Sequence, residues 1–258
     1  MSIIVCKFGG TSTASAGMFR RMRAILAQNP SRRYVVLSAP GRDGAKEKVT
    51  DLLYQKRMDE AAARFEAIAA ELGVCMDFGG EIERAARISE NMTVSRGEYL
   101  CAKLFSAWSG LPFVDAAEVI RFDGSDRIDC SETVHALHSM AKICPRAVIP
   151  GFYGSAPDGR IVTFPRNGSD ITGALVAAGV GAALYENWTD VPGLMTGDPA
   201  VDPGAERIEE ISYDGMRAMS ENGARVLHPD SLDAVARAGI PTRIKCTMNP
   251  DLPGTLVH

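Results

Sequence analysis

Several features that would place this chain in a specialised class of protein are missing from its sequence. No apolar run approaches the length of a membrane span, and the N-terminal segment reaches Lys7 and Gly9 before a signal-peptide core could form. The net charge of -4 leaves no basic excess for a nucleic-acid backbone, and Lys and Arg are not interleaved with aromatic residues. The sequence therefore predicts a cytoplasmic protein with neither a membrane nor a nucleic-acid partner.

Clustered metal ligands and paired cysteines are also missing. No C-x-x-C spacing joins the six cysteines, which are Cys6, Cys75, Cys101, Cys130, Cys144 and Cys246. This pattern favours small buried thiols in a reducing compartment over a disulfide framework or a zinc site. His135 and His138 lie three residues apart on an expected helix, but no carboxylate or thiol pattern accompanies them. No metal site is predicted from these side chains.

What the sequence does contain is the alternation of strands and helices of an α/β enzyme. Its 258 residues, 46% hydrophobic and 23% charged, suit a single domain, 1–258, with one core. Strands are expected at 3–8, 34–38, 146–155, 160–163, 182–189 and, as the last of the chain, 242–246. Helices are expected at 18–28, 49–72, 81–109, 131–142, 169–179, 214–222 and 229–238. The alternation predicts an open, mostly parallel sheet between helices.

Three loops that follow expected strands carry candidate chemistry. Glycines at 9 and 10 would let backbone N–H groups approach an anion, and Lys7 adds a full charge. A Gly-Gly turn after a strand is more often only a tight turn, and the P-loop pattern G-x-x-x-x-G-K-[ST] does not occur. Loops 39–44 and 164–170 follow two further strands. Loops at the carboxyl ends of parallel strands meet at one edge of the sheet, where such folds bind ligands.

Two acidic positions each admit a structural and a functional interpretation. Ser169 and Asp170 suit the N-terminus of a helix, as a cap and a first-turn acid, but they also suit a ligand site. Glu98 borders an apolar helix face, where an unpaired carboxylate is costly. Either an ammonium group of a ligand or a neighbouring arginine such as Arg96 could pair with Glu98.

Six motifs, taken together and in this order, resemble aspartate kinase. They are Lys7-Phe8-Gly9-Gly10-Thr11-Ser12, Val36-Leu37-Ser38-Ala39-Pro40-Gly41, Arg96-Gly97-Glu98, the segment 166–172, Trp188-Thr189-Asp190-Val191-Pro192-Gly193 and Val226-Leu227-His228-Pro229. The resemblance covers essentially the whole chain and implies the amino-acid-kinase fold. It also implies phosphorylation of the side-chain carboxylate of L-aspartate by ATP, with Mg²⁺, to give 4-phospho-L-aspartate, and it implies a homodimer. The product would feed amino-acid biosynthesis, with lysine biosynthesis as one pathway beside those of threonine, methionine or a specialised product.

The resemblance implies roles for individual residues as well. The catalytic residues would be Lys7, Asp170 and Arg225, with Asp170 orienting Lys7. The aspartate pocket would be lined by Ser38, Thr50, Glu98, Phe152, Arg166, Ser169 and Asp170. ATP would be bound by Lys7, Gly9, Gly10, Thr11, Ser12, Thr189, Asp190, Met195, Asp198 and Arg225. Trp188 would lie near the nucleotide unless it only packs in the core. A carboxylate acceptor needs no general base, because it is already ionised at neutral pH.

Some positions depart from the family's pattern. Pro165 and Asn167 replace glycines of the acceptor loop, Met195 replaces a frequent tyrosine, and Ala200 replaces an arginine. These departures leave open a catalytically weakened regulatory or binding paralogue. A kinase of another small acid such as glutamate is a second alternative, because the fold and the phosphate loops do not fix the acceptor. Relatives usually continue into ACT domains beyond the position of His258. The chain alone is therefore expected to escape inhibition by lysine or threonine, with regulation supplied by a separate chain.

Overall fold

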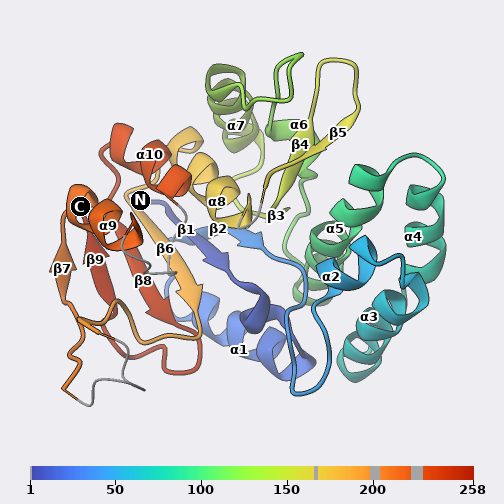
Figure 1. Cartoon of the computed structure of the whole chain (residues 1–258), viewed down its shortest axis with the longest axis horizontal. Helices are drawn as coiled ribbons and strands as arrows, with labels where there is room; N and C mark the ends of the chain where they lie inside the picture. The colour runs from blue at the N-terminus through green and yellow to red at the C-terminus, as the bar shows by residue number, and fades with distance from the viewer. Residues whose placement is uncertain (1, 166–167, 198–203, 222–228) are drawn as a thin grey trace.

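A central sheet covered by helices forms the body of the protein (Figure 1). The computed structural model describes residues 2–165, 168–197, 204–221 and 229–258. One sheet has the strand order β3-β2-β1-β6-β8-β9-β7, and β4 and β5 form a separate hairpin. The strands are β1 (Ile4–Phe8), β2 (Arg32–Leu37), β3 (Ala147–Pro150), β4 (Tyr153–Ser155), β5 (Ile161–Thr163), β6 (Leu184–Thr189), β7 (Glu210–Ile211), β8 (Thr242–Cys246) and β9 (Thr255–Val257). Within the large sheet as described, β8 and β9 pair antiparallel and every other neighbouring pair runs parallel, so the expected mostly parallel sheet is confirmed. The β4–β5 hairpin is antiparallel.

Helices cover both faces of this sheet (Figure 1). They are α1 (Ala16–Ala27), α2 (Val49–Tyr54), α3 (Met58–Leu72), α4 (Phe78–Ala86), α5 (Glu90–Ser109), α6 (Ala116–Val119), α7 (Cys130–Ile143), α8 (Gly168–Gly179), α9 (Tyr213–Glu221) and α10 (Pro229–Arg237), with a short 3-10 helix η1 (Gly10–Thr13) after β1. Helix α8 packs across β1, β2 and β6, while α1 lies on the opposite face (Figure 1). None of the helices in the described ranges is long and apolar enough to cross a membrane.

The glycine- and alanine-rich sequence of α8 lets this helix lie close to the sheet. A Cβ atom at Gly173 would come within 2.5 Å of the Tyr185 hydroxyl and 3.0 Å of the Lys7 Cβ, so a larger residue would push the helix outward. The first turn of α8, which carries Asp170, is thereby held next to the side chain of Lys7 on β1. The close packing that Gly173 allows thus positions Asp170 beside Lys7.

Two expected helices are each broken in the structure. The segment 49–72 forms α2 and α3 rather than one helix, because the backbone at Lys56 adopts a positive φ of 60° that a helix cannot continue through. The segment 81–109 forms α4 and α5, and the Ser89 side chain caps α5 by accepting the Met92 N–H. Apolar spacing continues across both breaks, which is why the sequence pattern did not reveal them.

The expected strands also need correction. The segment 146–155 does not form one strand, because the chain leaves the large sheet after β3 and turns at Phe152, where φ is 78°. The strand at 242–246 is not the last, since β9 follows it and pairs with it antiparallel. Strands β7 and β9 contain two and three residues, too few to show an alternating pattern.

Candidate active site

A cavity of about 550 Å³ opens where β1, β2 and β6 end, at the edge predicted from the glycine loops. Most of the predicted site residues that the structure describes line it together. They are Lys7, Gly9, Gly10, Thr11, Ser38, Thr50, Glu98, Phe152, Ser169, Asp170, Thr189 and Asp190. These residues come from segments far apart in the sequence, and parallel strand order brings them together.

The remaining predicted residues do not line this cavity in the described structure. Ser12 is buried and its hydroxyl is hydrogen-bonded to that of Thr247 at 2.7 Å, so its side chain is occupied within the fold. Met195 forms a bridge with Arg207 in the segment after β6, away from the cavity lining. The roles predicted for Ser12 and Met195 in ATP binding stay predictions, because the cavity lining does not include them. Arg166, Asp198 and Arg225, like Asn167 and Ala200, lie outside the described residues.

Lys7 and Asp170 form an ion pair at the wall of the cavity. The Lys7 Nζ lies 2.6 Å from the Asp170 Oδ1, and both side chains are about nine-tenths buried, with 9% and 11% of their surface exposed. The Asn187 side-chain amide donates a hydrogen bond to the same oxygen at 2.8 Å. Asn187 and Lys7 are register partners on β6 and β1, so adjacent strands present both groups to the first turn of α8. The predicted contact between Lys7 and Asp170 is thus present, and Asn187 completes it.

The two glycine loops touch each other backbone to backbone. The Gly41 N–H donates to the Gly10 carbonyl at 2.8 Å, and a Cβ at Gly41 would lie 2.5 Å from the Gly10 carbonyl carbon. Only glycine permits this approach at position 41. The Gly9 N–H donates to the Trp188 carbonyl at 3.0 Å and is not free for a phosphate. The N–H groups of Gly10 and Thr11 have no acceptor within the ranges the structure covers, so they are the available donors.

Glu98 is a buried carboxylate with one oxygen unpartnered. Its residue is only 4% exposed, and its Oε2 makes no hydrogen bond to any of the described residues. Burial raises the pKa of Glu98 to about 8, although the hydrogen bond from the Ala39 backbone opposes this shift. Arg96, the alternative partner, instead places its guanidinium 3.9 Å from the centre of the Tyr99 ring. No ion pair between Arg96 and Glu98 is seen, although Glu98 is among the residues that line the cavity. Pairing with an ammonium group of a ligand, the other expected partner, stays a prediction.

Several cavity residues were not identified from the sequence. They are Arg42, Lys48, Asp51, Tyr54 and Asn187. Asn187 could have been found from the alignment of β6 with β1, because a polar residue opposite Lys7 in a buried strand is unusual. Arg42 and Lys48 flank the loop after the second strand, and basic residues in a loop at a strand end were the available signal.

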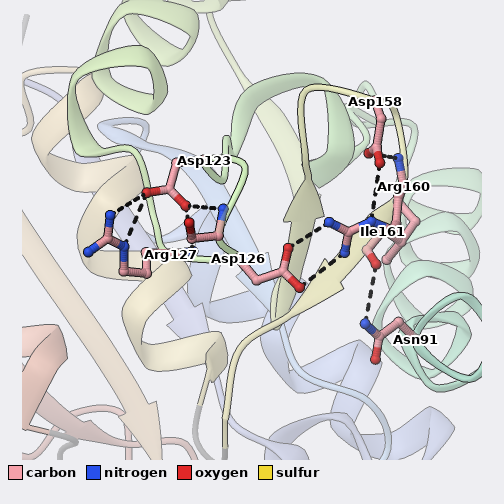
Figure 2. Close-up of polar contacts among 8 residues, drawn as sticks. Asn91, Asp123, Asp126, Arg127, Asp158, Arg160 and Ile161 are labelled. Atoms are coloured by element: carbon pink, nitrogen blue, oxygen red, sulfur yellow. Dashed lines mark hydrogen bonds and ion pairs between the residues drawn. The ribbon is translucent and has the colours of Figure 1, made fainter.

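The β4–β5 hairpin precedes the part of the cavity wall formed by Phe164 and Pro165, and polar contacts hold it in place (Figure 2). Arg160 forms a bidentate pair with Asp126, with the closer contact at 2.8 Å. The Asn91 side chain on α5 donates to the Ile161 carbonyl at 3.3 Å (Figure 2). The hairpin is thereby joined both to the loop before α7 and to α5, the helix that carries Glu98.

Comparisons with known proteins agree with this geometry. Residues 2–246 match the model of the amino acid kinase family. Aspartokinase 3 of Bacillus subtilis (strain 168) is 32% identical over 286 residues, which covers 98% of this chain and 63% of that protein. The crystal structure of Clostridium acetobutylicum aspartate kinase superposes with a TM-score of 0.92 and 37% identity, over 100% of this chain and 63% of that one.

A structure of E. coli aspartokinase III in complex with aspartate and ADP is also similar, with a TM-score of 0.87 and 31% identity over 99% of this chain and 64% of that one. The chain therefore spans somewhat less than two thirds of the length of these relatives. The family match extends over nearly every described element, including those that carry Lys7, Glu98 and Asp170. On this evidence the chain belongs to the amino acid kinase family.

Proposed function

We propose that this chain transfers the γ-phosphoryl group of ATP to the side-chain carboxylate of L-aspartate, forming 4-phospho-L-aspartate. The observation that carries the proposal is the placement of two charged features in one cavity. The Lys7–Asp170 pair lies at the end of β1 beside the glycine loops, and Glu98 on α5, which has one buried and unpartnered carboxylate oxygen, lines the same cavity. The likeness to a kinase that was solved with aspartate and ADP supports the choice of both substrates.

The glycine-loop side of the cavity suits the phosphates. Lys7 would place an ammonium against the transferring phosphoryl group, and the free N–H groups of Gly10 and Thr11 would donate to its oxygens. Asp170 and Asn187 hold the lysine side chain in one orientation, so little reorganisation is needed as charge develops. Thr189 and Asp190 at the end of β6 line the neighbouring wall, where the resemblance places the rest of ATP.

The α5 side of the cavity suits the amino acid. Glu98 in its ionised form would accept the α-ammonium group, and Thr50 and Ser169 supply hydroxyls nearby in the lining. We infer from the resemblance that Arg166 binds the α-carboxylate. The attacking carboxylate is already ionised, so the protein needs to align two anions rather than to remove a proton.

Mg²⁺ fits this site as a cation held chiefly by ATP. Among the residues that the structure describes, no group of three or more histidine, cysteine or acidic side chains could hold a metal ion. Magnesium in phosphoryl-transfer sites commonly uses phosphate oxygens, water and only one or two carboxylates. Asp170 and Asp190, both in the cavity lining, are the carboxylates best placed beside the phosphates. When bound, the ion would neutralise charge on the phosphate oxygens.

Turnover of ATP with and without candidate acceptors tests the proposal. We expect ADP formation that depends on aspartate and is weak with glutamate, together with an acyl phosphate that hydroxylamine traps as a hydroxamate. Faster turnover with glutamate would instead favour a kinase of another acid. Tight binding of ATP and aspartate without turnover would favour the weakened paralogue.

Other features of the whole protein rest on the resemblance alone. We propose a single catalytic domain over 1–258, a homodimer and a cytoplasmic location, with regulation through a separate chain. The molar mass in solution, measured by light scattering, tests the dimer directly.

A further inference from the structure

The loop between β2 and α2 contributes to the cavity two cationic side chains that have no part in the function proposed above. Arg42 and Lys48 stand at its two ends, are exposed, and line the cavity together with Lys7. Within the described part of the chain neither has an ion-pair partner. The third basic residue of the loop, Lys46, differs on both counts, because it pairs with Asp43 at 3.2 Å and does not line the cavity.

A buried arginine on α3 fixes the shape of this loop. The Arg64 guanidinium, in a residue only 8% exposed, donates to the Gly41 carbonyl at 2.9 Å, to the Ala14 carbonyl at 3.3 Å and to the Glu47 carbonyl. Gly41 and Glu47 immediately precede Arg42 and Lys48. Burying a guanidinium is unfavourable unless its donors are satisfied, and here loop carbonyls accept them. Arg64 therefore holds the backbone next to both cations.

The charges that line the cavity indicate what these two side chains could bind. Among the described residues, the cations that line it are Lys7, Arg42 and Lys48, and the carboxylates are Asp51, Glu98, Asp170 and Asp190. Lys7 is already paired with Asp170. A kinase that joins a phosphate to a carboxylate must bring two anions together, which requires positive charge not neutralised by the protein. Arg42 and Lys48 supply that charge.

We propose that Arg42 binds the terminal phosphate of the nucleotide, that Lys48 binds the side-chain carboxylate of the acceptor, and that Arg64 is the positioning residue for both. This inference rests on the proposed function. Arg42 follows Gly41, whose backbone contacts Gly10 at the phosphate end of the cavity. Lys48 lies two residues before Thr50, on the side of the cavity assigned to the amino acid. A guanidinium suits phosphate oxygens, and a lysine suits a single carboxylate as a point charge.

Three glutamine variants of the same loop test the assignment. Calorimetry measures their affinity for nucleotides, and steady-state kinetics measure their KM for aspartate. Each variant is titrated with β,γ-methylene-ATP and with ADP, both in the presence of Mg²⁺. Arg42→Gln should lose about tenfold in affinity for the triphosphate and none for the diphosphate. Lys48→Gln should bind both nucleotides normally while its KM for aspartate rises about tenfold. Lys46→Gln is the matched control, and it should be normal in all three measurements. Arg64→Met should show both losses although Arg42 and Lys48 are retained.

The outcomes separate this inference from the function on which it rests. If the unmodified chain bound neither nucleotide, the proposed kinase activity would be rejected, and the roles of Arg42 and Lys48 with it. If the unmodified chain binds and turns over ATP while Arg42→Gln and Lys48→Gln match Lys46→Gln, only the loop assignment is wrong. An equal loss of ADP and triphosphate affinity in Arg42→Gln also contradicts the assignment, because the contact would then not be to the terminal phosphate.

Discussion

Two buried ion pairs lie on opposite faces of the sheet beside consecutive residues of β6, since the first contacts Asn187 and the second includes Glu186. The first is Lys7 with Asp170, which faces α8 and the cavity, and the second is Arg32 with Glu186, which faces away from it. Their closest contacts are similar, at 2.6 and 2.8 Å, and so is their side-chain exposure, at 9% and 11% against 10% and 5%. Neither burial nor distance distinguishes the pair proposed to act on a ligand from the pair that does not.

The partners of each carboxylate do distinguish them. Both oxygens of Glu186 are occupied, by two nitrogens of Arg32, by the Trp188 indole N–H at 3.0 Å and by the Cys6 thiol at 3.3 Å. Asp170 uses only Oδ1 for its two side-chain contacts and borders the cavity. A charge whose partners all lie within the fold is structural, whereas one that keeps an open side remains available to a ligand.

Trp188 lies with the Arg32–Glu186 pair, to which its indole N–H donates a hydrogen bond. It was expected near the nucleotide or in the core, and the structure places its fully buried ring in the core, stacked on Phe8. The cations of Arg32 and Lys245 lie 5.1 and 5.3 Å from the ring centre. Only its backbone carbonyl reaches the glycine loop, through Gly9. Its fluorescence would therefore report on the packing of the sheet rather than on direct contact with ATP.

Glu186→Gln should have the largest effect, and the effect should be on stability. The change leaves Arg32 buried without a counter-charge, which costs about 3 to 5 kcal/mol in the free energy of unfolding. Urea unfolding measures this loss, and turnover per folded molecule should be retained. Normal stability with lost turnover would reverse the roles given to the two ion pairs.

Lys7→Met should have the converse effect. We expect kcat to fall by about two orders of magnitude or more, because a charge acting on the transferring phosphoryl group is removed. The thermal midpoint should change little, since Asp170 can turn toward the cavity and water. A variant that melts early but keeps normal turnover in its folded fraction would show that Lys7 is structural.

Glu98 predicts a pH dependence of acceptor binding. Its pKa is raised from 4.5 to about 8, so at pH 7 the free protein holds it mainly protonated and unable to pair with an ammonium. The KM for aspartate should fall about tenfold between pH 7 and pH 9 as the carboxylate ionises. Because the folded state binds this proton more tightly than the unfolded chain does, ionisation also lowers stability as the pH rises from 4.5 to about 8.

Glu98→Gln is the control for that measurement. The variant should bind aspartate weakly at every pH and lose the fall in KM, with nucleotide affinity unchanged. A pH profile identical to that of the unmodified chain would mean that another group controls acceptor binding.

Asn187→Leu should have the smallest effect and act only through its neighbours. It removes the hydrogen bond to Asp170 but leaves the pair with Lys7, so we expect kcat to fall about fivefold with little change in KM. In the Lys7→Met background the same substitution should cause no further loss. Additive losses would instead indicate that Asn187 touches the substrate itself.

The sequence by itself determined where the candidate site was expected and named most of the charged residues that line the cavity there. Glycine loops after expected strands predicted the sheet edge, and the motif resemblance identified Lys7, Glu98 and Asp170, which the structure brings into one cavity. This succeeded because the carboxyl ends of parallel strands necessarily meet at one edge. The helix breaks at Lys56 and Ser89 were missed because apolar spacing does not register a local change of backbone angle.

Only the tertiary structure decided which face of each strand meets the cavity and which loop cations reach it. Alternation along β6 shows that Asn187 and Trp188 point to opposite faces, but it does not say which face will hold α8 and the cavity. The position of Arg42 likewise depends on Arg64, which lies on another helix and holds the loop through backbone carbonyls. Such contacts join residues distant in sequence through groups that every residue possesses, so no residue pattern records them.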